Sequence, residues 1–249
     1  MWSRCRVGHQ DRHDILNVST SPWPTSDMYV YDWWMYGGQN LDRWQEYCPG
    51  QDVISRALDD EGVWERHESA LFVDILKHGL PDPAPVYDFG CQLGWYSALA
   101  DRLGYPVVAC DVNSENVALT RLNAPDADVF LGAVDKDCKP IWPQRMRCVK
   151  IDIEGAEQWA VRMIEPSLEY ALIDYILMEV SPVFHDGYPA LMERICSYGY
   201  DPWLIPSNDR DCPSRFDKEP LRALTHSPTL DLATVPGMHQ VDVMFARKP

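Results

Sequence analysis

Short apolar runs rich in β-branched residues alternate with segments of helical spacing from about residue 85 onward. Short, continuous apolar runs are typical of buried strands, whereas apolar residues three and four positions apart indicate amphipathic helices. The strands are predicted at residues 86–89, 107–111, 129–133, 148–153 and 175–180. The helices between them are predicted at residues 96–103, 115–122, 157–164 and 188–197. This alternation predicts a doubly wound α/β fold, with a mostly parallel sheet covered by helices on both faces.

The end of the chain breaks the alternation. Residues 202–205 and 240–246 are predicted to form two more strands, and the polar, proline-bearing segment 206–236 between them is interpreted as a loop. Two strands joined without a helical crossover predict an antiparallel hairpin at the edge of the sheet. A loop of this length is unusual in a compact domain, so we expect it to be functional or partly disordered.

The beginning of the chain is dense in aromatic residues and also holds Gly37 and Gly38. Flat rings could stack on a sugar or a ring-shaped substrate, and the glycines would let such a lid move. The same rings could equally cover an apolar edge of the sheet. For a chain of 249 residues we therefore predict an N-terminal extension or lid at 1–63 and one catalytic domain at 64–249.

Composition and charge argue against several classes of protein. The formal net charge of −16 would repel a phosphate backbone, so nucleic acid is not expected as the substrate. The N-terminal residues contain no apolar run long enough for a secretory signal, and the most apolar stretch, 170–180, is interrupted by acids and too short to span a membrane. The eight cysteines form no C-x-x-C pair, which argues against zinc and favours free thiols in a reducing compartment. We therefore expect a cytoplasmic protein.

Candidate cofactor residues follow the first predicted strand. That strand ends in a turn that contains Gly90, Gln92 and Gly94 and opens directly into a helix. Glycine lets a backbone approach a ligand closely, and open α/β sheets bind nucleotides at the carboxyl end of this strand. The second strand ends at Asp111, close to the spacing of roughly 20 residues at which an acid accepts hydrogen bonds from a ribose. Together these features indicate an adenosine-containing cofactor.

The turn itself discriminates between cofactors. A dinucleotide requires G-x-G-x-x-G, whose backbone amides hold the pyrophosphate. Here Gln92 occupies the second glycine position, and Asp88 places a carboxylate where phosphates would lie. A cofactor with a sulfonium and an ammonium group tolerates that acid better, so the residues favour S-adenosylmethionine over NAD. The alternatives are an NAD-dependent oxidoreductase, which Gln92 disfavours, and a non-catalytic interaction module, which the intact cofactor residues disfavour.

Three motifs, in this order, resemble those of FkbM-type methyltransferases. The turn D-F-G-C-Q-L-G at 88–94 is similar to that family's D-x-G-A-N-x-G, and C-D-V-N-S-E-N-V at 110–117 resembles its acidic strand end followed by P-N-P-x-N. The segment V-K-I-D-I-E-G-A-E at 149–157 is similar to the hallmark K-I-D-V-E-G-x-E, and 177–180 looks like the family's fifth strand, which ends in an acid. The resemblance covers about residues 64–180.

The resemblance implies a Rossmann-like class I methyltransferase fold and an S-adenosylmethionine-dependent enzyme, often an O-methyltransferase of sugars or natural products. It also implies that the turn holds the amino-acid end of the cofactor, Asp111 the ribose, and Gly132 with Ala133 the adenine. The chain has Cys91 for alanine, Gln92 for asparagine and Asp111 for glutamate, and we expect these changes to alter cofactor affinity rather than identity. The expected cofactor residues are Asp88, Gly90, Cys91, Gln92, Gly94, Asp111, Val112, Gly132, Ala133 and Asp152.

Methyl transfer to a hydroxyl needs an aligned acceptor oxygen and a route for its proton. Asp152, Glu154 and Glu179 follow the fourth and fifth strands, and His185 lies in the next loop. His185 is the natural general base because its ordinary pKa of about 6.5 leaves it mostly neutral at pH 7, although it could also be an ordinary loop residue. Asp152 or Glu154 could serve in a dry pocket, or the three acids could bind Mg²⁺ if the fourth strand runs through Glu154. Lys150 in that strand is expected to pair with a carboxylate.

Overall fold

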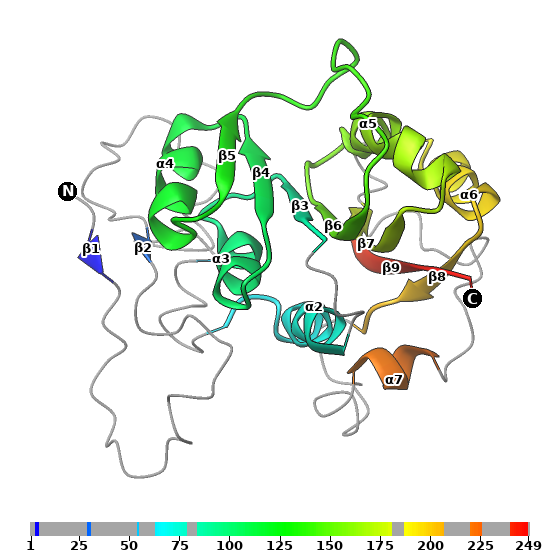
Figure 1. The fold of residues 1–249 in the computed structure, drawn as a ribbon, viewed down its shortest axis with the longest axis horizontal. Helices are drawn as coiled ribbons and strands as arrows, with labels where there is room; N and C mark the ends of the chain where they lie inside the picture. The colour runs from blue at the N-terminus through cyan, green and yellow to red at the C-terminus, as the bar shows by residue number, and fades with distance from the viewer. Residues whose placement is uncertain are drawn as a thin grey trace.

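The computed structural model describes residues 3–4, 29–30, 54, 63–78, 84–180, 187–206, 220–225 and 240–248. Its centre is a seven-stranded sheet in the order β5-β4-β3-β6-β7-β9-β8 (Figure 1). The strands of this sheet are β3 (Val86–Phe89), β4 (Val107–Asp111), β5 (Asp128–Leu131), β6 (Met146–Ile151), β7 (Ile173–Val180), β8 (Tyr200–Leu204) and β9 (Val241–Arg247). The helices are α2 (Arg66–His78), α3 (Trp95–Arg102), α4 (Ser114–Asn123), α5 (Glu157–Glu169), α6 (Tyr188–Ser197) and α7 (Pro220–Thr225).

The strand order reverses between β3 and β6. From β3 the chain moves outward through β4 to β5 and then returns to the other side of β3 for β6 and β7, and all of these neighbours pair in parallel. Strand β9 runs antiparallel to both β7 and β8. The predicted doubly wound, Rossmann-like sheet with an antiparallel C-terminal hairpin is therefore confirmed. In such sheets ligands bind at the carboxyl ends of the strands beside the point of reversal, here the ends of β3 and β6.

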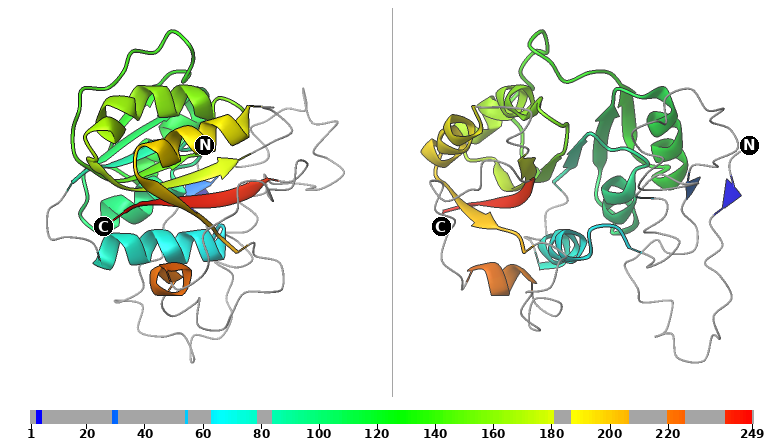
Figure 2. Two further views of the ribbon diagram at one scale, coloured as in Figure 1. Left: turned by 90° about the vertical axis from the view of Figure 1, so that its right-hand side faces the viewer. Right: turned by 180° about the vertical axis from the view of Figure 1, so that it is seen from behind.

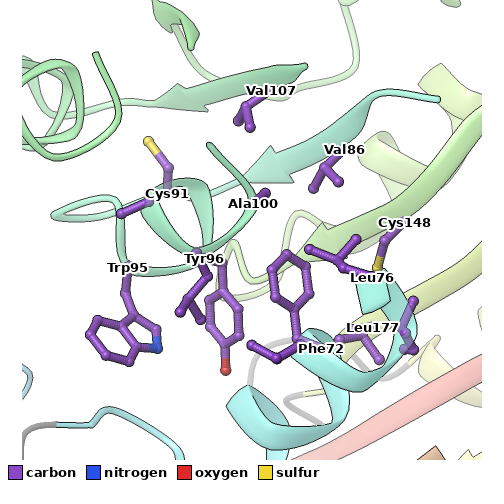
Figure 3. Close-up of a cluster of buried hydrophobic side chains, with 14 of the residues drawn as sticks. Phe72, Leu76, Val86, Cys91, Trp95, Tyr96, Ala100, Val107, Cys148 and Leu177 are labelled. Carbon is purple, nitrogen blue, oxygen red and sulfur yellow. The ribbon is translucent and has the colours of Figure 1, made fainter. Parts of the chain in front are cut away.

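Helices cover both faces of the sheet (Figure 2). The apolar sides of α2, α3 and α4 share one buried cluster with one face, and those of α5 and α6 share a second cluster with the other. In the first cluster the rings of Phe72 and Tyr96 meet edge to face with centroids 5.1 Å apart (Figure 3). Helix α4 begins at a side-chain cap, in which Asn113 accepts a hydrogen bond from the N–H of Glu115. None of the described helices is long and apolar enough to cross a membrane.

The structure corrects the predicted edge of the sheet, the predicted loop and the predicted end of one strand. Strand β9 lies inside the sheet between β7 and β8, so of the two hairpin strands only β8 lies at an edge. The segment interpreted as a loop contains α7, which packs against α2, and the N–H of Leu221 donates to Asp74 at 2.9 Å. Strand β6 ends at Ile151 rather than at residue 153. The chain turns toward α5 there, because Glu154 and Gly155 have left-handed backbone conformations with φ angles of 43° and 99°.

Little of the predicted N-terminal extension lies within the described residues. Strand β1 (Ser3–Arg4) pairs antiparallel with β2 (Tyr29–Val30), and β2 lies against α4. Most of the aromatic residues of the extension lie outside the described part of the chain. Its role as a lid, and the division at residue 63, stay predictions.

Candidate cofactor and acceptor site

Two glycines of the turn after β3 occupy positions that only glycine can fill. Gly90 has a φ of 84°, and a Cβ there would lie 1.8 Å from the backbone oxygen of Asp152. Gly94 has a φ of 85° at the start of α3, and its Cβ would lie 2.8 Å from the Cα of Thr120 in α4. Gly90 therefore brings the turn after β3 into contact with the end of β6, and Gly94 allows α3 to pack closely on α4.

The carboxylate of Asp111 accepts hydrogen bonds that hold the turn after β3 against the start of α4. It accepts backbone N–H groups of Gln92 at 2.9 Å and Asn113 at 2.8 Å, and the side-chain amide of Asn116 at 2.9 Å. Because these donors come from the turn after β3 and from the start of α4, Asp111 connects two elements. The non-glycine residue Gln92 has a φ of 48°, a strained angle of the kind that clusters at functional sites.

Apolar surface is exposed beside Asp111. Val112 is 71% exposed and Leu131 is 57% exposed, although both are large hydrophobic residues. Gly132 and Ala133 are also exposed, and the N–H of Gly132 donates to the backbone oxygen of Asp111 at 3.0 Å. The ends of β4 and β5 thus form an apolar shelf, defined by Val112, Leu131, Gly132 and Ala133, next to a carboxylate.

Asp88 and Cys91 lie beneath the turn rather than on its surface. Asp88 is 1% exposed and accepts a hydrogen bond from the Ser97 hydroxyl at 2.6 Å. Burial raises the pKa of Asp88 to about 6, although the hydrogen bond from Ser97 and the charge of Lys150 lower it. Cys91 is buried beside Thr120, whose hydroxyl lies 3.3 Å from its sulfur, and burial raises the pKa of its thiol well above the usual range.

A row of carboxylates crosses the ends of the three strands beyond β3. Leu177 and Met244 belong to the buried cluster that includes the apolar side of α2, so strand alternation directs Glu179 and Asp242 toward the same helix. Glu179 and Asp242 are direct partners in the β7–β9 pair, and Asp152 follows the last residue of β6 that pairs with β7. The row is therefore Asp152, Glu179 and Asp242.

Lys150 is the cation within this group. Its side chain is 1% exposed, with its Nζ 3.3 Å from Asp152 Oδ2 and 3.5 Å from Glu68 Oε2. The Nζ also lies 5.1 Å from the centre of the Tyr96 ring, and the Tyr96 hydroxyl donates to Glu65 at 2.6 Å and approaches Glu68 at 3.1 Å. The predicted pairing of Lys150 with a carboxylate is confirmed. Burial opposes the charge of Lys150, but the carboxylates around it, Asp152 first, raise its pKa well above the usual value.

Crowding and burial weaken the acidity of these carboxyl groups. Burial, reinforced by the charge of Asp152, raises the pKa of Glu179 to about 8. Burial also raises the pKa of Asp242 to about 6 and that of Glu68 well above its usual value, with Lys150 opposing both shifts. Acidic groups with raised pKa values are thus held together at this corner, which is common at functional sites.

Only two of the three predicted acids lie together in the structure. Asp152 and Glu179 lie together, with one carboxylate oxygen from each and one from Glu65 all within 4.8 Å of one another. The predicted magnesium set of Asp152, Glu154 and Glu179 is not formed, because β6 stops at Ile151 and Glu154 is exposed in the following turn. His185 lies outside the described residues.

Glu65, Glu68 and Asp242 were not identified as site residues from the sequence. Glu65 and Glu68 come from the start of α2 and its preceding turn, and Asp242 comes from β9, all far along the chain from Asp152. One signal was present, since Asp242 is an acid in the otherwise apolar run 241–246. Burying a charged group inside a sheet costs free energy, so an isolated acid in such a strand indicates a functional or paired residue.

The sheet order, with β9 inserted antiparallel, defines a Rossmann-like class I methyltransferase fold. No protein-family model and no curated protein sequence matches the chain, so its resemblance to FkbM-type methyltransferases stays a prediction.

Among solved structures, the chain is similar to a magnesium protoporphyrin IX methyltransferase from Synechocystis with bound S-adenosylmethionine, at 12% identity and a TM-score of 0.46 over 87% of this chain and 95% of that one. It is also similar to a precorrin-6y C5,15-methyltransferase from Geobacter metallireducens, at 13% identity and a TM-score of 0.45 over 76% and 93% of the two chains. An rRNA methylase from Streptococcus thermophilus gives 15% identity and a TM-score of 0.43 over 74% and 97%.

Proposed function

We propose that this chain is an S-adenosylmethionine-dependent methyltransferase that methylates a hydroxyl group of a sugar or another small molecule. The observation that carries the proposal is the contact between Gly90 and the backbone of Asp152. Because of this contact, the turn that would receive the cofactor and the carboxylates that would face the acceptor share one corner of the sheet. That corner lies where the strand order reverses, the usual ligand position in such folds.

The residues around the turn fit the cofactor. Asp111 uses three of the roughly four lone-pair positions of a carboxylate on protein donors, which leaves capacity for a ribose hydroxyl. The apolar shelf beside it offers a surface for an adenine ring. Asp88 below the turn and Asp152 beside it supply negative charge where the sulfonium and ammonium groups would lie. The same acids would repel a pyrophosphate, so the NAD alternative remains disfavoured.

The chemistry requires little of the protein beyond alignment and proton removal. When bound, S-adenosylmethionine supplies an electrophilic methyl group: the acceptor oxygen forms a bond to the methyl carbon, and the C–S bond breaks with its electron pair left on sulfur. The residues of this chain hold the acceptor oxygen in line and receive its proton. Among the described carboxylates, Asp152 and Glu179 are the candidates that we assign to this step. His185 stays a candidate base outside the described residues.

The proposal is tested by thermal-shift titration with S-adenosylmethionine, S-adenosylhomocysteine and NADH in separate samples. A ligand at about 100 times its Kd adds roughly 2.7 kcal/mol, or on the order of 5–10 °C for a chain of this size. We expect a shift with both sulfur compounds that is lost in Asp111→Ala. The matched control is Asp128→Ala, an exposed acid at the opposite end of β5, which should keep the shift. A shift with NADH alone, or with none of the three, would overturn the proposal.

The acceptor class needs a separate assay. Purified protein and cofactor labelled in the methyl group are incubated with panels of sugars, phenols, amines and short RNAs, and the label is followed into each panel. Label in a hydroxyl-bearing small molecule supports the proposed acceptor. Label that enters only amines or RNA would overturn O-methylation while leaving methyl transfer intact.

A further inference from the structure

The backbone of Gln92 is held from two sides. Its N–H donates to Asp111 Oδ2 at 2.9 Å, and its carbonyl oxygen accepts a hydrogen bond from the Thr120 hydroxyl at 3.0 Å. Its φ of 48° also lies in the left-handed region, which non-glycine residues seldom adopt. Because Asp111 ends β4 and Thr120 belongs to α4, these two elements fix the backbone. Only the side chain of Gln92, which is partly exposed, can move without breaking these contacts.

The amides of the turn after β3 differ in what accepts their hydrogen bonds. The N–H groups of Gly90, Cys91 and Gly94 donate to backbone oxygens at 2.7–3.1 Å. The N–H of Leu93 instead donates to Oε1 of the Gln92 side chain at 2.6 Å. Within this turn, all of which the structure describes, the Leu93 amide is therefore the one that rotation of a side chain alone can release for another acceptor.

The amino-acid end of the proposed cofactor carries both an ammonium and a carboxylate. Asp88 and Asp152 attract the ammonium, but they repel the carboxylate, which needs N–H donors. The Leu93 amide directly precedes Gly94, the N-cap of α3, and the start of a helix favours negative charge. A carboxylate also forms a stronger hydrogen bond with this amide than the neutral carboxamide of Gln92 does.

We propose that the Gln92 side chain and the carboxylate of S-adenosylmethionine compete for the N–H of Leu93, so that Gln92 controls how strongly this chain prefers ligands with that carboxylate. When the cofactor binds, the Gln92 side chain rotates away and the carboxylate accepts the hydrogen bond instead. The backbone of the turn keeps its other contacts. The inference rests on the proposed function, because it takes S-adenosylmethionine as the ligand of this turn. It assigns Gln92 a role in ligand selection rather than in methyl transfer.

The test compares two ligands that differ only in the carboxylate: S-adenosylmethionine and its decarboxylated form, which keeps the adenosine, the sulfonium and the amine. Their Kd values for the full chain are measured by calorimetry, and the ratio of the two reports the binding of the carboxylate. We expect Gln92→Ala to bind S-adenosylmethionine roughly two- to tenfold more tightly, because one neutral competing hydrogen bond is removed. The Kd of the decarboxylated ligand should stay within about twofold of its original value.

Gln92→Glu tests the same contact with the opposite sign. A glutamate of the same length is a charged acceptor for the Leu93 amide and repels a second carboxylate. S-adenosylmethionine should therefore bind at least about tenfold more weakly relative to the decarboxylated ligand. The matched control is Gln144→Glu, the same change in the segment before β6, at the opposite end of that strand from the turn, and it should leave the ratio unchanged. Thermal unfolding without ligand shows whether each variant is folded, and either Gln92 variant alone decides the question.

The outcomes separate this inference from the proposed function. A ratio that moves in opposite directions in the two Gln92 variants, and stays constant in Gln144→Glu, supports the competition. An unchanged ratio in both Gln92 variants overturns it, and so does weaker binding of S-adenosylmethionine by Gln92→Ala, which would show that Gln92 itself holds the carboxylate. In these cases the unaltered chain still binds both ligands, and the methyltransferase proposal is unaffected. Failure of the unaltered chain to bind either ligand overturns the proposed cofactor and this inference together.

Discussion

Glu179 and Asp242 lie directly opposite each other in the antiparallel pair of β7 and β9, two acids where a sheet usually places complementary side chains. The pair faces Lys150 and Asp152 across the end of β6, beside the glycine turn of β3. This cross-strand relationship connects the C-terminal hairpin to the candidate site. Two acids in this position are expected to destabilise the sheet, and such groups are common at functional sites.

Asp242→Asn should stabilise the ligand-free protein at neutral pH. Burial raises the pKa of Asp242 to about 6, so the folded state holds its proton more tightly than the unfolded state does. The folded state then binds more protons between about pH 4 and pH 6, and this contribution to stability is lost as the pH rises through that window. We expect the variant to unfold at least about 2 °C higher at pH 7.5, corresponding to about 1 kcal/mol, and the advantage to shrink by pH 4.5. Thermal unfolding in metal-free buffers across this range checks the prediction; an advantage that grows toward low pH would contradict it.

Gly90→Ala should abolish cofactor binding and destabilise the fold. The added Cβ would lie 1.8 Å from the backbone oxygen of Asp152, which cannot move without shifting the end of β6. Gly104→Ala is the matched control, because Gly104 has a similar φ of 81° but nothing within 4 Å of its Cβ position. The control should cost about 1–2 kcal/mol from backbone strain alone, and Gly90→Ala distinctly more. Chemical denaturation and cofactor titration measure both; equal costs would show that the contact with Asp152 is unimportant.

Lys150→Met should be among the most destabilising single changes. The change removes the cation that pairs with Glu68 and Asp152, and the side chain of Lys150 is only 1% exposed. Removing one partner of a buried ion pair typically costs about 3–5 kcal/mol of folding stability. Lys136→Met removes a lysine from an ion pair whose side chains are 69% and 77% exposed, and it should cost close to nothing. Urea denaturation of both variants compares them. A small effect at Lys150 would mean that its carboxylate neighbours are neutral in the folded protein.

Val112→Asp should weaken S-adenosylmethionine binding without changing stability. Val112 is 71% exposed, so its replacement disturbs little packing, but a charge on the apolar shelf would lie where the adenine ring is proposed to rest. We expect at least a tenfold higher Kd by calorimetry and an unfolding temperature within about 1–2 °C of the original. Trp142→Asp adds the same charge at a side chain that is 88% exposed in the segment before β6, and it should bind the cofactor normally. Equal affinity in the two variants would place the adenine elsewhere.

The local sequence pattern was sufficient to predict the fold class and the glycine turn after β3. The alternation of apolar runs with helical spacing predicted β3, β4 and α6 to the residue, because burial on a sheet face or a helix face imposes a period that is visible in the sequence. Gly90, Gly94 and Asp111 were identifiable because backbone angle and position at a strand end are local properties. The resemblance to FkbM-type methyltransferases named the same residues, and their contact with a cofactor stays a prediction.

The composition of the acidic corner was decided only by the tertiary structure. Glu154 looked like a partner of Asp152 as long as the strand was taken to run through it, but the left-handed turn at Glu154 separates it from the acidic corner. Glu65 and Asp242 entered the site because α2 packs over the face of the sheet where β9 inserts beside β7, a pairing between segments far apart along the chain. Sequence period determines which face of an element is buried. Which charged groups then meet depends on how distant elements pack and pair, and no local pattern carries that information.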